Sequence, residues 1–442
     1  MEQLDTRIDN AIVITADEAD TVHRNGWVGI ADGRIAGVGS MADPLPTAVE
    51  TEDAGGGIVM PGLVNTHTHL PMTLFRGLAD DLPLETWLTD RIFEAERRYI
   101  DPETVAVGTR LACAEMIRSG TTTCCDGYFH EDAVAEAVLA SGMRAVLGQG
   151  VIDFPAPGVP DPADGVRTAA AFLDRWTGVS DRITPSIFCH SPYTCGDATL
   201  KAAKAAAGLH PFQIHVAETR SERDQSIKQW GVSPVVRLDR LGVIDERTLL
   251  VHGVWIDKAD REIIARRGAA VAHCPESNMK LASGIAPVPA LMAAGIPVGL
   301  GTDGCASANT LDLFGTADRA AKLQKVVTGD PTALSAVTVV AMLTRIGARA
   351  VGLGETVGAL IPGRAADLIR ISVDRPHLVP LYEPRSHLVY AVRGDDVTDV
   401  MVAGRWLLRR GVLTTLDEAG VKEAARAVGR RISADREGGK WR

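Results

Sequence analysis

The chain has 442 residues, of which 46% are hydrophobic and 23% are charged, a composition typical of a globular protein with one large domain and a smaller one. Its 56 acidic residues outnumber its 46 basic residues, giving a net charge of −10. This balance argues against a nucleic-acid partner, because phosphate binding needs a basic surface. A small molecule is the expected partner.

The seven cysteines show no C-x-x-C spacing and are odd in number, which favours reduced thiols in the cytoplasm. The first residues, MEQLDTRIDNAIVITADE, contain neither a basic stretch nor a long apolar stretch, so we expect no signal peptide. No apolar run approaches the roughly 18 residues that cross a bilayer, so we expect no membrane partner.

The chain begins with a β-rich region at 7–60 that has Gly-containing turns and no helical period. A similar region lies at 363–413, and both are expected to fold together. The predicted domains are therefore a small β-sandwich from 1–60 plus 360–420, a central domain over 61–359, and a C-terminal helix and tail over 421–442. A solvated face is the preferred interpretation of that helix.

Between the flanks, short β-rich runs alternate with longer helical patterns, as in βα units around a parallel sheet. The first run precedes His67, and the other seven lie at 121–129, 144–153, 183–190, 212–218, 247–255, 269–275 and 296–304. Eight parallel strands, each followed by a helix, make a TIM barrel, whose functional groups lie at the C-terminal ends of the strands. The predicted fold class is α/β, a distorted (β/α)8 barrel inserted into the small β-sandwich.

Polar residues stand where these runs end. His67 and His69 end the first run and share one face of a strand, because residues i and i+2 point the same way. The fifth run ends in His215, with Glu218 just beyond, the sixth in His252 and the eighth in Asp303. Taken singly, each could be a buried polar residue without function, but chance placement at four strand ends is improbable.

Imidazoles and a carboxylate are suitable ligands for zinc or another borderline divalent ion, with a position left for water. Such an ion lowers the pKa of its water from 15.7 toward about 7. Asp303 could then accept the water's proton, and His252 could hold the nucleophile in line. Glu218 is placed to move a proton to the leaving group or a ring nitrogen of the substrate.

Five motifs carry a specific resemblance: HTH at 67–69, HVAE at 215–218, VHG at 251–253, HCPESNMKLASGIAPV at 273–288 and GTDGCASANTLDLF at 301–314. Together they resemble the amidohydrolase superfamily, and within it the branch of 5-methylthioadenosine/S-adenosylhomocysteine deaminases and s-triazine chlorohydrolases. The resemblance implies one metal per subunit, usually zinc, held by His67, His69, His215 and Asp303, with Fe²⁺ or Mn²⁺ as alternatives. It also implies a homo-oligomer.

The fourth run ends in SIFCH, without the lysine that bridges two metals in dinuclear relatives, so a single metal is expected. Further stretches at 70–88, 128–131 and 189–196 resemble the nucleoside deaminases in particular. By that resemblance, Glu96 accepts hydrogen bonds from ribose hydroxyls, Trp87 packs against the nucleoside, and His190 donates to the substrate. Solvent exposure for Glu96 and core packing for Trp87 are the plainer alternatives. His273 and Asn278 are expected in the pocket wall, with Ser307 supporting Asp303.

Relatives that accept a homocysteine tail are expected to carry arginine near the third run, since a guanidinium best holds a carboxylate. Here that place has Gln149, and the following loop has no basic residue before Arg167. The sequence therefore predicts deamination of adenosine or 5′-methylthioadenosine in preference to S-adenosylhomocysteine. The alternatives are an s-triazine amino- or chlorohydrolase, a guanine or pterin deaminase, and, much less favoured, a scaffold without catalysis.

Overall fold

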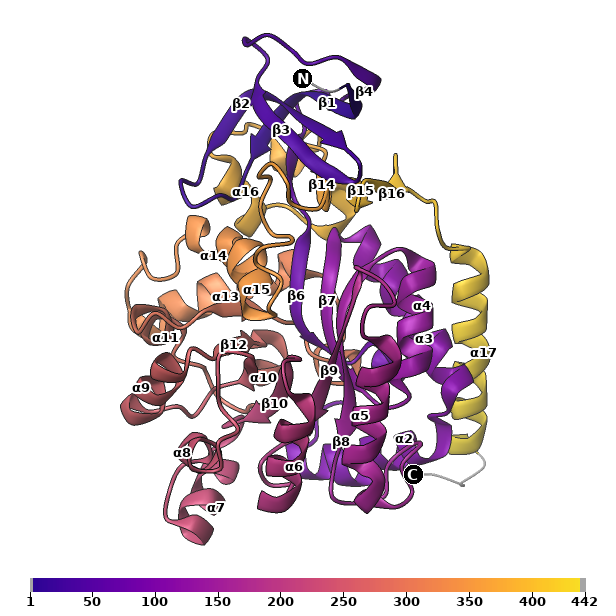
Figure 1. The fold of residues 1–442 in the computed structure, drawn as a ribbon, viewed down its shortest axis with the longest axis vertical. Coiled ribbons are helices and arrows are strands. Elements are labelled where there is room, and N and C mark those ends of the chain that lie inside the picture. The colour runs from indigo at the N-terminus through magenta and orange to yellow at the C-terminus, as the bar shows by residue number, and fades with distance from the viewer. Residues whose placement is uncertain (1–2, 438–442) are drawn as a thin grey trace.

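The structure is a computed structural model that describes residues 3–437, arranged as a β-rich unit above a larger barrel (Figure 1). Within the described residues the β-rich unit is one nine-stranded sheet in the order β17-β16-β15-β14-β5-β1-β2-β3, with β4 also pairing β1. Both ends of the chain contribute to it, as the sequence predicts. Its strands are β1 (Leu4–Ile14), β2 (Val22–Ala31), β3 (Arg34–Ser40), β4 (Ala48–Asp53), β5 (Ile58–Pro61), β14 (Leu368–Ile371), β15 (Val397–Val402), β16 (Arg405–Arg409) and β17 (Val412–Leu413).

The barrel confirms the predicted α/β class. Among residues 3–437, eight strands run parallel in the order β6 to β13, each paired with the next along the chain. These strands are β6 (Leu63–Thr68), β7 (Thr121–Tyr128), β8 (Arg144–Val151), β9 (Ile183–Cys189), β10 (Phe212–Val216), β11 (Thr248–His252), β12 (Ala270–His273) and β13 (Val298–Leu300). Each lies within the run that the sequence pattern predicts.

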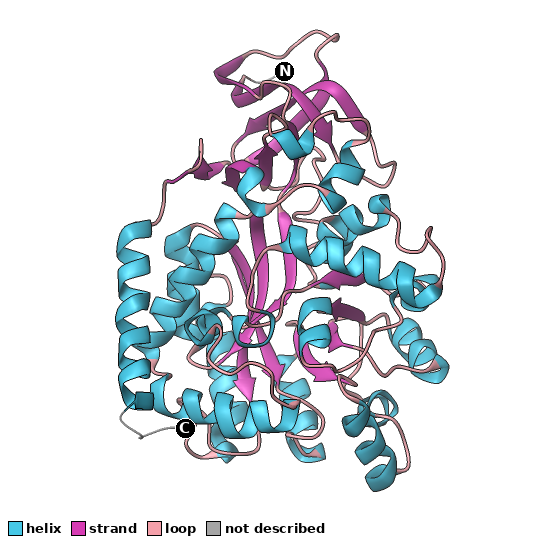
Figure 2. Ribbon diagram, turned by 180° about the vertical axis from the view of Figure 1, so that it is seen from behind, coloured by secondary structure: helices cyan, strands magenta, loops and turns pink. Residues whose placement is uncertain are grey.

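Helices cover the outside of the barrel, which Figure 2 shows from behind. The first half of the chain contributes η1 (Leu70–Phe75), α1 (Leu84–Thr86), the π-helix η2 (Trp87–Ile92), α2 (Phe93–Tyr99), α3 (Pro102–Arg118), α4 (Glu131–Ser141), η3 (Pro162–Asp164), α5 (Gly165–Trp176) and α6 (Asp197–Ala207). The second half contributes α7 (Arg220–Trp230), α8 (Pro234–Arg240), α9 (Lys258–Arg267), α10 (Pro275–Lys280), α11 (Val288–Ala293), α12 (Cys305–Ala308), α13 (Leu313–Thr328), α14 (Ala336–Leu343), α15 (Arg345–Ala350), η4 (Pro376–Leu378), α16 (Pro384–Tyr390), η5 (Gly394–Asp396) and α17 (Glu418–Glu437).

Helix α17 runs along the outside of the barrel beside α3 (Figure 1). It buries Val421 and Ile432, and its Glu418 is paired with Arg118 of α3. Most of its other side chains are exposed or half-buried, which agrees with the predicted solvated face.

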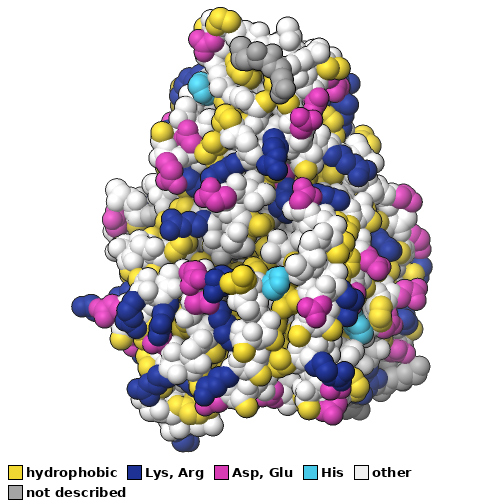
Figure 3. All heavy atoms as spheres, viewed as in Figure 1, with side chains coloured by type: hydrophobic (Ala, Val, Ile, Leu, Met, Phe, Trp, Pro, Cys, Tyr) yellow, Lys and Arg dark blue, Asp and Glu magenta, His cyan; other side chains and the backbone are white. Residues whose placement is uncertain are grey.

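Charged side chains of both signs are interspersed over the face of the molecule seen in Figure 3.

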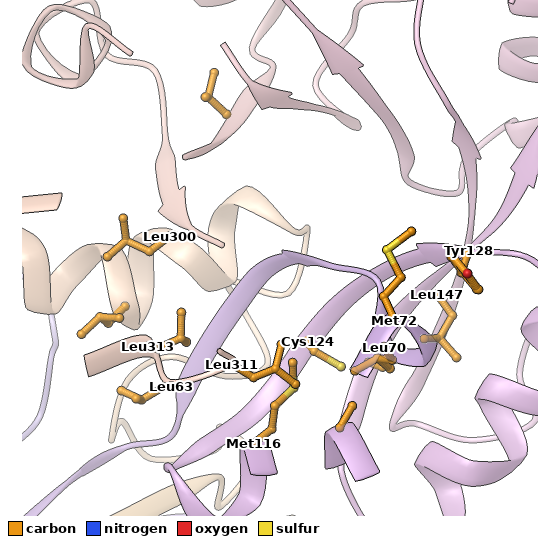
Figure 4. Packing of buried hydrophobic residues seen from close by; sticks show 14 of the residues in the cluster. Leu63, Leu70, Met72, Met116, Cys124, Tyr128, Leu147, Leu300, Leu311 and Leu313 are labelled. Atoms are coloured by element: carbon orange, nitrogen blue, oxygen red, sulfur yellow. The ribbon is translucent and has the colours of Figure 1, made fainter. Parts of the chain in front are cut away.

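The barrel closes where its first and last strands meet. The side chain of Asn65 in β6 donates to Thr302 Oγ1 at 2.8 Å and accepts from the Thr302 N–H at 3.1 Å. The N–H of Asp303 donates to the carbonyl of His67 at 3.0 Å. Apolar side chains near this seam, including Leu63, Leu300 and Leu313, form part of one large core (Figure 4). These contacts bring two segments more than 230 residues apart in sequence into register.

One glycine and one ion pair join the two units. β5 continues into β6 through Gly62, where an added Cβ would lie 2.1 Å from Thr122 Oγ1, so no larger residue fits. The Gly62 N–H donates to the carbonyl of Asp367 at 3.0 Å. Arg144 of β8 is 2% exposed, and its Nε donates to Asp367 Oδ2 at 2.9 Å. Since both charges are buried, each depends on the other for compensation.

Replacing Arg144 by leucine should therefore destabilise the protein strongly. The change leaves the Asp367 carboxylate buried without its cation, and we expect the free energy of unfolding to fall by about 3–5 kcal/mol. Chemical denaturation followed by circular dichroism measures it. The matched control is Lys258→Ala, which removes an exposed pair with Glu262 on α9 and should cost less than about 0.5 kcal/mol. Equal losses in the two variants would contradict the assigned role of Arg144.

Candidate active site

The structure gathers the predicted polar residues at one end of the barrel. His67 lies in β6 with His69 one residue beyond it, His215 lies in β10, His252 ends β11, and Asp303 follows β13. Each of these five side chains is buried. The parallel strands all point their carboxyl ends to this side, which is why residues so distant in sequence converge.

Four of them form a tight cluster. His67 Nε2 lies 3.1 Å from His215 Nε2 and 3.5 Å from Asp303 Oδ1, and His69 Nε2 lies 3.3 Å from the same oxygen. His69 Nδ1 donates to the carbonyl of Gly127 at 2.6 Å, so the Nε2 lone pair points into the cluster. The ring nitrogens and the carboxylate oxygen thus face a common point.

Burial keeps the imidazoles of His67 and His215 neutral. It lowers the pKa of His67 to about 4 against the opposing hydrogen bond with Asp303, and it holds the pKa of His215 well below its usual range. Burial opposes ionisation of Asp303, but the hydrogen bond with His67 and the surrounding imidazoles hold the pKa of that carboxyl well below its usual range. At neutral pH the cluster therefore includes the neutral imidazoles of His67 and His215 and the Asp303 carboxylate.

Asp303 is held by hydroxyl and backbone donors. Its Oδ2 accepts from Ser277 Oγ at 2.6 Å and from Ser307 Oγ at 3.0 Å, while its Oδ1 accepts from the Gly304 N–H at 2.7 Å. The support from Ser307 is what the sequence predicts. These bonds orient the carboxylate, with Oδ1 directed at His67 and His69.

Glu218 stands beside this cluster without contributing to it. Its Oε2 lies 3.8 Å from His252 Nε2, and its Oε1 accepts from Ser283 Oγ at 3.4 Å. Burial, reinforced by the charge of Asp303, raises the pKa of Glu218 to about 8, so it carries a proton at neutral pH. Asn278 Nδ2 donates to His252 Nδ1 at 3.1 Å, which places the ring proton on Nε2, facing Glu218.

A cavity opens in front of these groups. His69, His215, Glu218, His252 and Asp303 form its polar end. Its space, including the open mouth, is about 700 Å³. The rest of the lining is mainly apolar and aromatic and comprises Met72, Leu84, Trp87, Leu88, Phe93, Phe129, Val151, Phe188 and Leu281, with Glu96, Tyr128, His190 and Tyr193 as polar additions.

Three of the predicted substrate-binding residues, Trp87, Glu96 and His190, line this cavity. Glu96 is 4% exposed, in contrast to the solvated alternative, and Tyr128 donates its hydroxyl to Glu96 Oε1 at 2.7 Å. Burial, partly offset by that hydrogen bond, raises the pKa of Glu96 to about 7. The Nδ1 of His190 is bonded to Thr194 Oγ1 at 2.9 Å, so Nε2 remains for a ligand.

Three predicted residues lie elsewhere. Gln149 does not line the cavity, because its Oε1 accepts from the Glu131 N–H at 3.2 Å at the start of α4. Asn278 lies behind the cavity wall, bonded to His252. His273 is fully enclosed behind the wall as well. Position at a strand end shows which residues approach the site, but the rotamer decides which of them reach it.

Sequence reasoning missed the residues that support the site. Tyr128, Ser277 and Ser283 act through single hydrogen bonds to Glu96, Asp303 and Glu218, and nothing in their spacing reveals those partners. Glu222 is another, since its carboxylate accepts from the backbone at 217–218. The available signal was the T-x-x-E pattern at 219–222, which is that of a helix capping box.

The cluster fits a divalent metal ion. His67, His69 and Asp303 form one group whose ligand atoms all lie within 4.8 Å of one another, and His67, His215 and His252 form a second. Three imidazoles and a carboxylate are the donors that borderline divalent ions prefer. The Nε2 atoms of His67 and His215 approach to 3.1 Å, a contact that a shared cation would stabilise.

Comparison with known proteins agrees with this geometry. Residues 58–407 match the model of the amidohydrolase family. The chain belongs to the amidohydrolase family. A 5-methylthioadenosine/S-adenosylhomocysteine deaminase of Syntrophobacter fumaroxidans is 47% identical over 96% of this chain and 97% of its own length. A 5′-deoxyadenosine deaminase of Methanothermobacter thermautotrophicus is 44% identical over 92% of this chain and 94% of its own.

A solved structure extends the likeness to the whole fold. The adenosine deaminase from Xanthomonas campestris, crystallised with bound zinc, is 38% identical and superposes with a TM-score of 0.95 over 98% of this chain and 99% of its own. This amidohydrolase shares with it the barrel and the flanking β-sheet unit. None of the helices described between residues 3 and 437 is long and apolar enough to cross a membrane.

The metal assignment makes a direct prediction. We expect the purified protein to carry about one divalent metal ion per chain, and His215→Ala to retain less than a tenth of it, because one of four ligands is lost. Metal content after dialysis, measured by mass spectrometry, tests both expectations. His210→Ala, outside the cluster, is the control. Full metal content in His215→Ala would remove His215 from the ligand set.

Proposed function

We propose that this amidohydrolase is a zinc-dependent deaminase of adenine nucleosides that converts the adenine ring to hypoxanthine with release of ammonia. The observation that carries the proposal is Glu218, a protonated carboxyl group beside the metal-ligand cluster, 3.8 Å from His252 and open to the cavity. Hydrolytic removal of an amino group needs such a proton donor, because ammonia leaves only after protonation. The relatives named as nucleoside deaminases support the same activity.

In this proposal His67, His69, His215 and Asp303 hold the metal. Bound there, a divalent ion supplies a hydroxide nucleophile at neutral pH by lowering the pKa of water. The Asp303 carboxylate accepts the proton of the attacking water, and His252 orients the nucleophile through its Nε2 proton. Glu218 donates its proton to the ring nitrogen beside C6. A C6–O bond forms, Asp303 gives the proton that it took from the water to the amino group, and the C6 hydroxyl returns a proton to Glu218. The C6–N bond then breaks, and the protonated amino group leaves as ammonia.

Other residues of the cavity lining suit a ribose. The Glu96 carboxylate, with one oxygen bonded to Tyr128, offers its second oxygen to the hydroxyls of a diol. His190 can donate through Nε2 to a ring nitrogen or a ribose oxygen. An s-triazine or a free guanine base has no diol to satisfy Glu96, so the nucleoside is the better match to this buried carboxylate.

A second cavity indicates which 5′ substituents are accepted. It adjoins the first through Phe93, Glu96 and Phe129, and apolar residues such as Ile152 and Phe154 line it. Arg97 at its edge is already paired with Glu94 at 2.7 Å. A neutral, apolar 5′ group therefore fits better than a charged homocysteine tail, and adenosine, 5′-deoxyadenosine and 5′-methylthioadenosine are the preferred substrates.

An ammonia-release assay on the zinc-loaded protein tests this function. Adenosine, 5′-methylthioadenosine, S-adenosylhomocysteine, guanine and a melamine-type triazine are compared side by side. We expect turnover of the two neutral nucleosides to exceed that of S-adenosylhomocysteine, with little on guanine or the triazine. Turnover of guanine or the triazine alone would refute the nucleoside assignment.

Glu218→Gln should keep the metal and lose the reaction. The amide preserves shape but cannot donate a carboxyl proton, so kcat for adenosine should fall by about 10²–10⁴-fold with metal content unchanged. Steady-state kinetics with metal analysis measures both. Gln225→Glu, on the exposed face of α7, should leave kcat unaltered. A Glu218→Gln variant that retains full activity would exclude Glu218 as the proton donor.

Glu96→Gln tests the ribose contact. Losing a charged acceptor should raise KM for adenosine by about 10–100-fold, since hydrogen bonds to charged groups contribute roughly 1.5–3 kcal/mol. The same change should leave KM for 2′,3′-dideoxyadenosine within about threefold, because that substrate lacks the diol. Equal effects on the two substrates would place Glu96 away from the ribose.

The pH dependence of KM offers an independent measurement of the same contact. Burial raises the pKa of Glu96 to about 7, so the carboxyl group is protonated below this value and ionised above it. Only the ionised form accepts hydrogen bonds from both hydroxyls. KM for adenosine should therefore fall as pH rises from 6 to 8, and this trend should be absent in Glu96→Gln.

A further inference from the structure

The chain makes an unusual turn just before Glu218. Strand β10 ends at Val216, and Ala217 then has φ +51°, a left-handed conformation that residues with a Cβ seldom adopt. The Ala217 carbonyl accepts from the N–H groups of Val254 at 3.0 Å and Trp255 at 2.8 Å. This turn points Glu218 toward the metal-ligand cluster instead of continuing the strand direction.

A single carboxylate binds the other side of the turn. Glu222 Oε1 accepts from the Ala217 N–H at 2.9 Å, and Glu222 Oε2 accepts from the Glu218 N–H at 2.8 Å. Glu222 is 6% exposed, so the two bonds are shielded from water. Both of its oxygens are used, one for the N–H of each of the two peptide groups that flank Ala217.

The start of helix α7 places Glu222 there. Thr219 is the N-cap, and its Oγ1 accepts from the Glu222 N–H at 3.1 Å. In an ordinary capping box the carboxylate three residues into the helix returns to the N–H of the N-cap itself. Here it reaches the two preceding N–H groups. Burial raises the pKa of Glu222 to about 8, against the opposing hydrogen bonds from the N–H groups of Ala217 and Glu218.

By contrast, the side chain of Glu218 is held loosely. Its contacts are Ser283 Oγ at 3.4 Å and His252 Nε2 at 3.8 Å. Its position therefore depends on its backbone. We propose that Glu222 is a positioning residue that fixes the Ala217 turn and so holds Glu218 at the reacting atoms. This inference rests on the proposed function, in which Glu218 transfers the proton.

The test is Glu222→Gln in the full-length, zinc-loaded protein. An amide has only one oxygen, so one of the two N–H groups faces an NH₂ and loses its acceptor. We expect kcat for adenosine to fall by about 10–100-fold, since displacement of a reacting group by about 1 Å can cost 10²-fold. KM and zinc content should stay within about twofold.

A double-mutant cycle separates positioning from general damage. In the Glu218→Gln background, Glu222→Gln should reduce kcat by less than about twofold, because the group it positions is already inactive. A reduction as large as in the wild-type background would overturn the inference. So would a folded, metal-loaded Glu222→Gln variant with wild-type kcat.

Asp260→Asn is the matched control for stability. Asp260 occupies the equivalent third position of α9, is fully buried, and accepts from the Asp257 N–H at 3.1 Å. Its replacement should lower the melting temperature while kcat remains within about twofold of wild type. A loss of kcat in Asp260→Asn matching that of Glu222→Gln would mean that any weakened helix start impairs the reaction.

A crystal structure of Glu222→Gln gives a readout that does not depend on activity. Ala217 should leave the left-handed region and the Glu218 side chain should turn away from His252. If both residues keep their positions, the inference is refuted. If the wild-type protein releases no ammonia from any nucleoside, the proposed function fails, and the crystal structure still decides whether Glu222 fixes the turn.

Discussion

The contact between the first and last barrel strands is the constraint on which the site depends. The Asp303 N–H bonds to the His67 carbonyl, and the Asn65 side chain bonds twice to Thr302. Without this closure, Asp303 would have no histidines to face, and the donor set would be incomplete. This closure also explains the glycine at position 301, because a Cβ there would lie 2.9 Å from the backbone nitrogen of His67. Barrel packing and metal-ligand geometry are thus one requirement in this region.

Three residues with strained backbone lie at this same end of the barrel. His252 has φ +72° and Asp303 has φ +64°, and Ala217 joins them in the left-handed region. Such conformations are unfavourable for residues with a Cβ and persist only where surrounding contacts impose them. Each lies at or just after the carboxyl end of a strand, where an extended chain would carry a polar side chain past the cavity. The strain is the consequence of turning these side chains inward, and the hydrogen bonds to the neighbouring loops stabilise it.

Much of this arrangement is readable from the sequence, and the limit has a physical origin. Alternation of β-rich and helical runs predicts all eight strands, because periodicity is a local property of the chain. The end of each strand then locates His67, His215 and Asp303. Gln149 also lies near the end of a strand, yet its side chain bonds to the start of α4 and does not reach the cavity. Tyr128 supports Glu96, and Glu222 supports the backbone at 217–218, through hydrogen bonds that depend on side-chain rotamers, which no local pattern encodes.

The cavity holds two carboxyl groups whose environments push their pKa values in opposite directions. Asp303 faces His67 and His69, whose attraction outweighs the cost of burial and keeps it ionised, whereas Glu218 meets burial and the charge of Asp303 and stays protonated. A base and an acid are therefore available at the same pH within one site, which is how paired carboxyl groups divide proton transfer. Because the charge of Asp303 contributes to keeping Glu218 protonated, removing that charge should weaken both roles together. The distance between Glu218 and Asp303 therefore matters to the chemistry as much as their residue types. The Ala217 turn determines where Glu218 lies relative to Asp303.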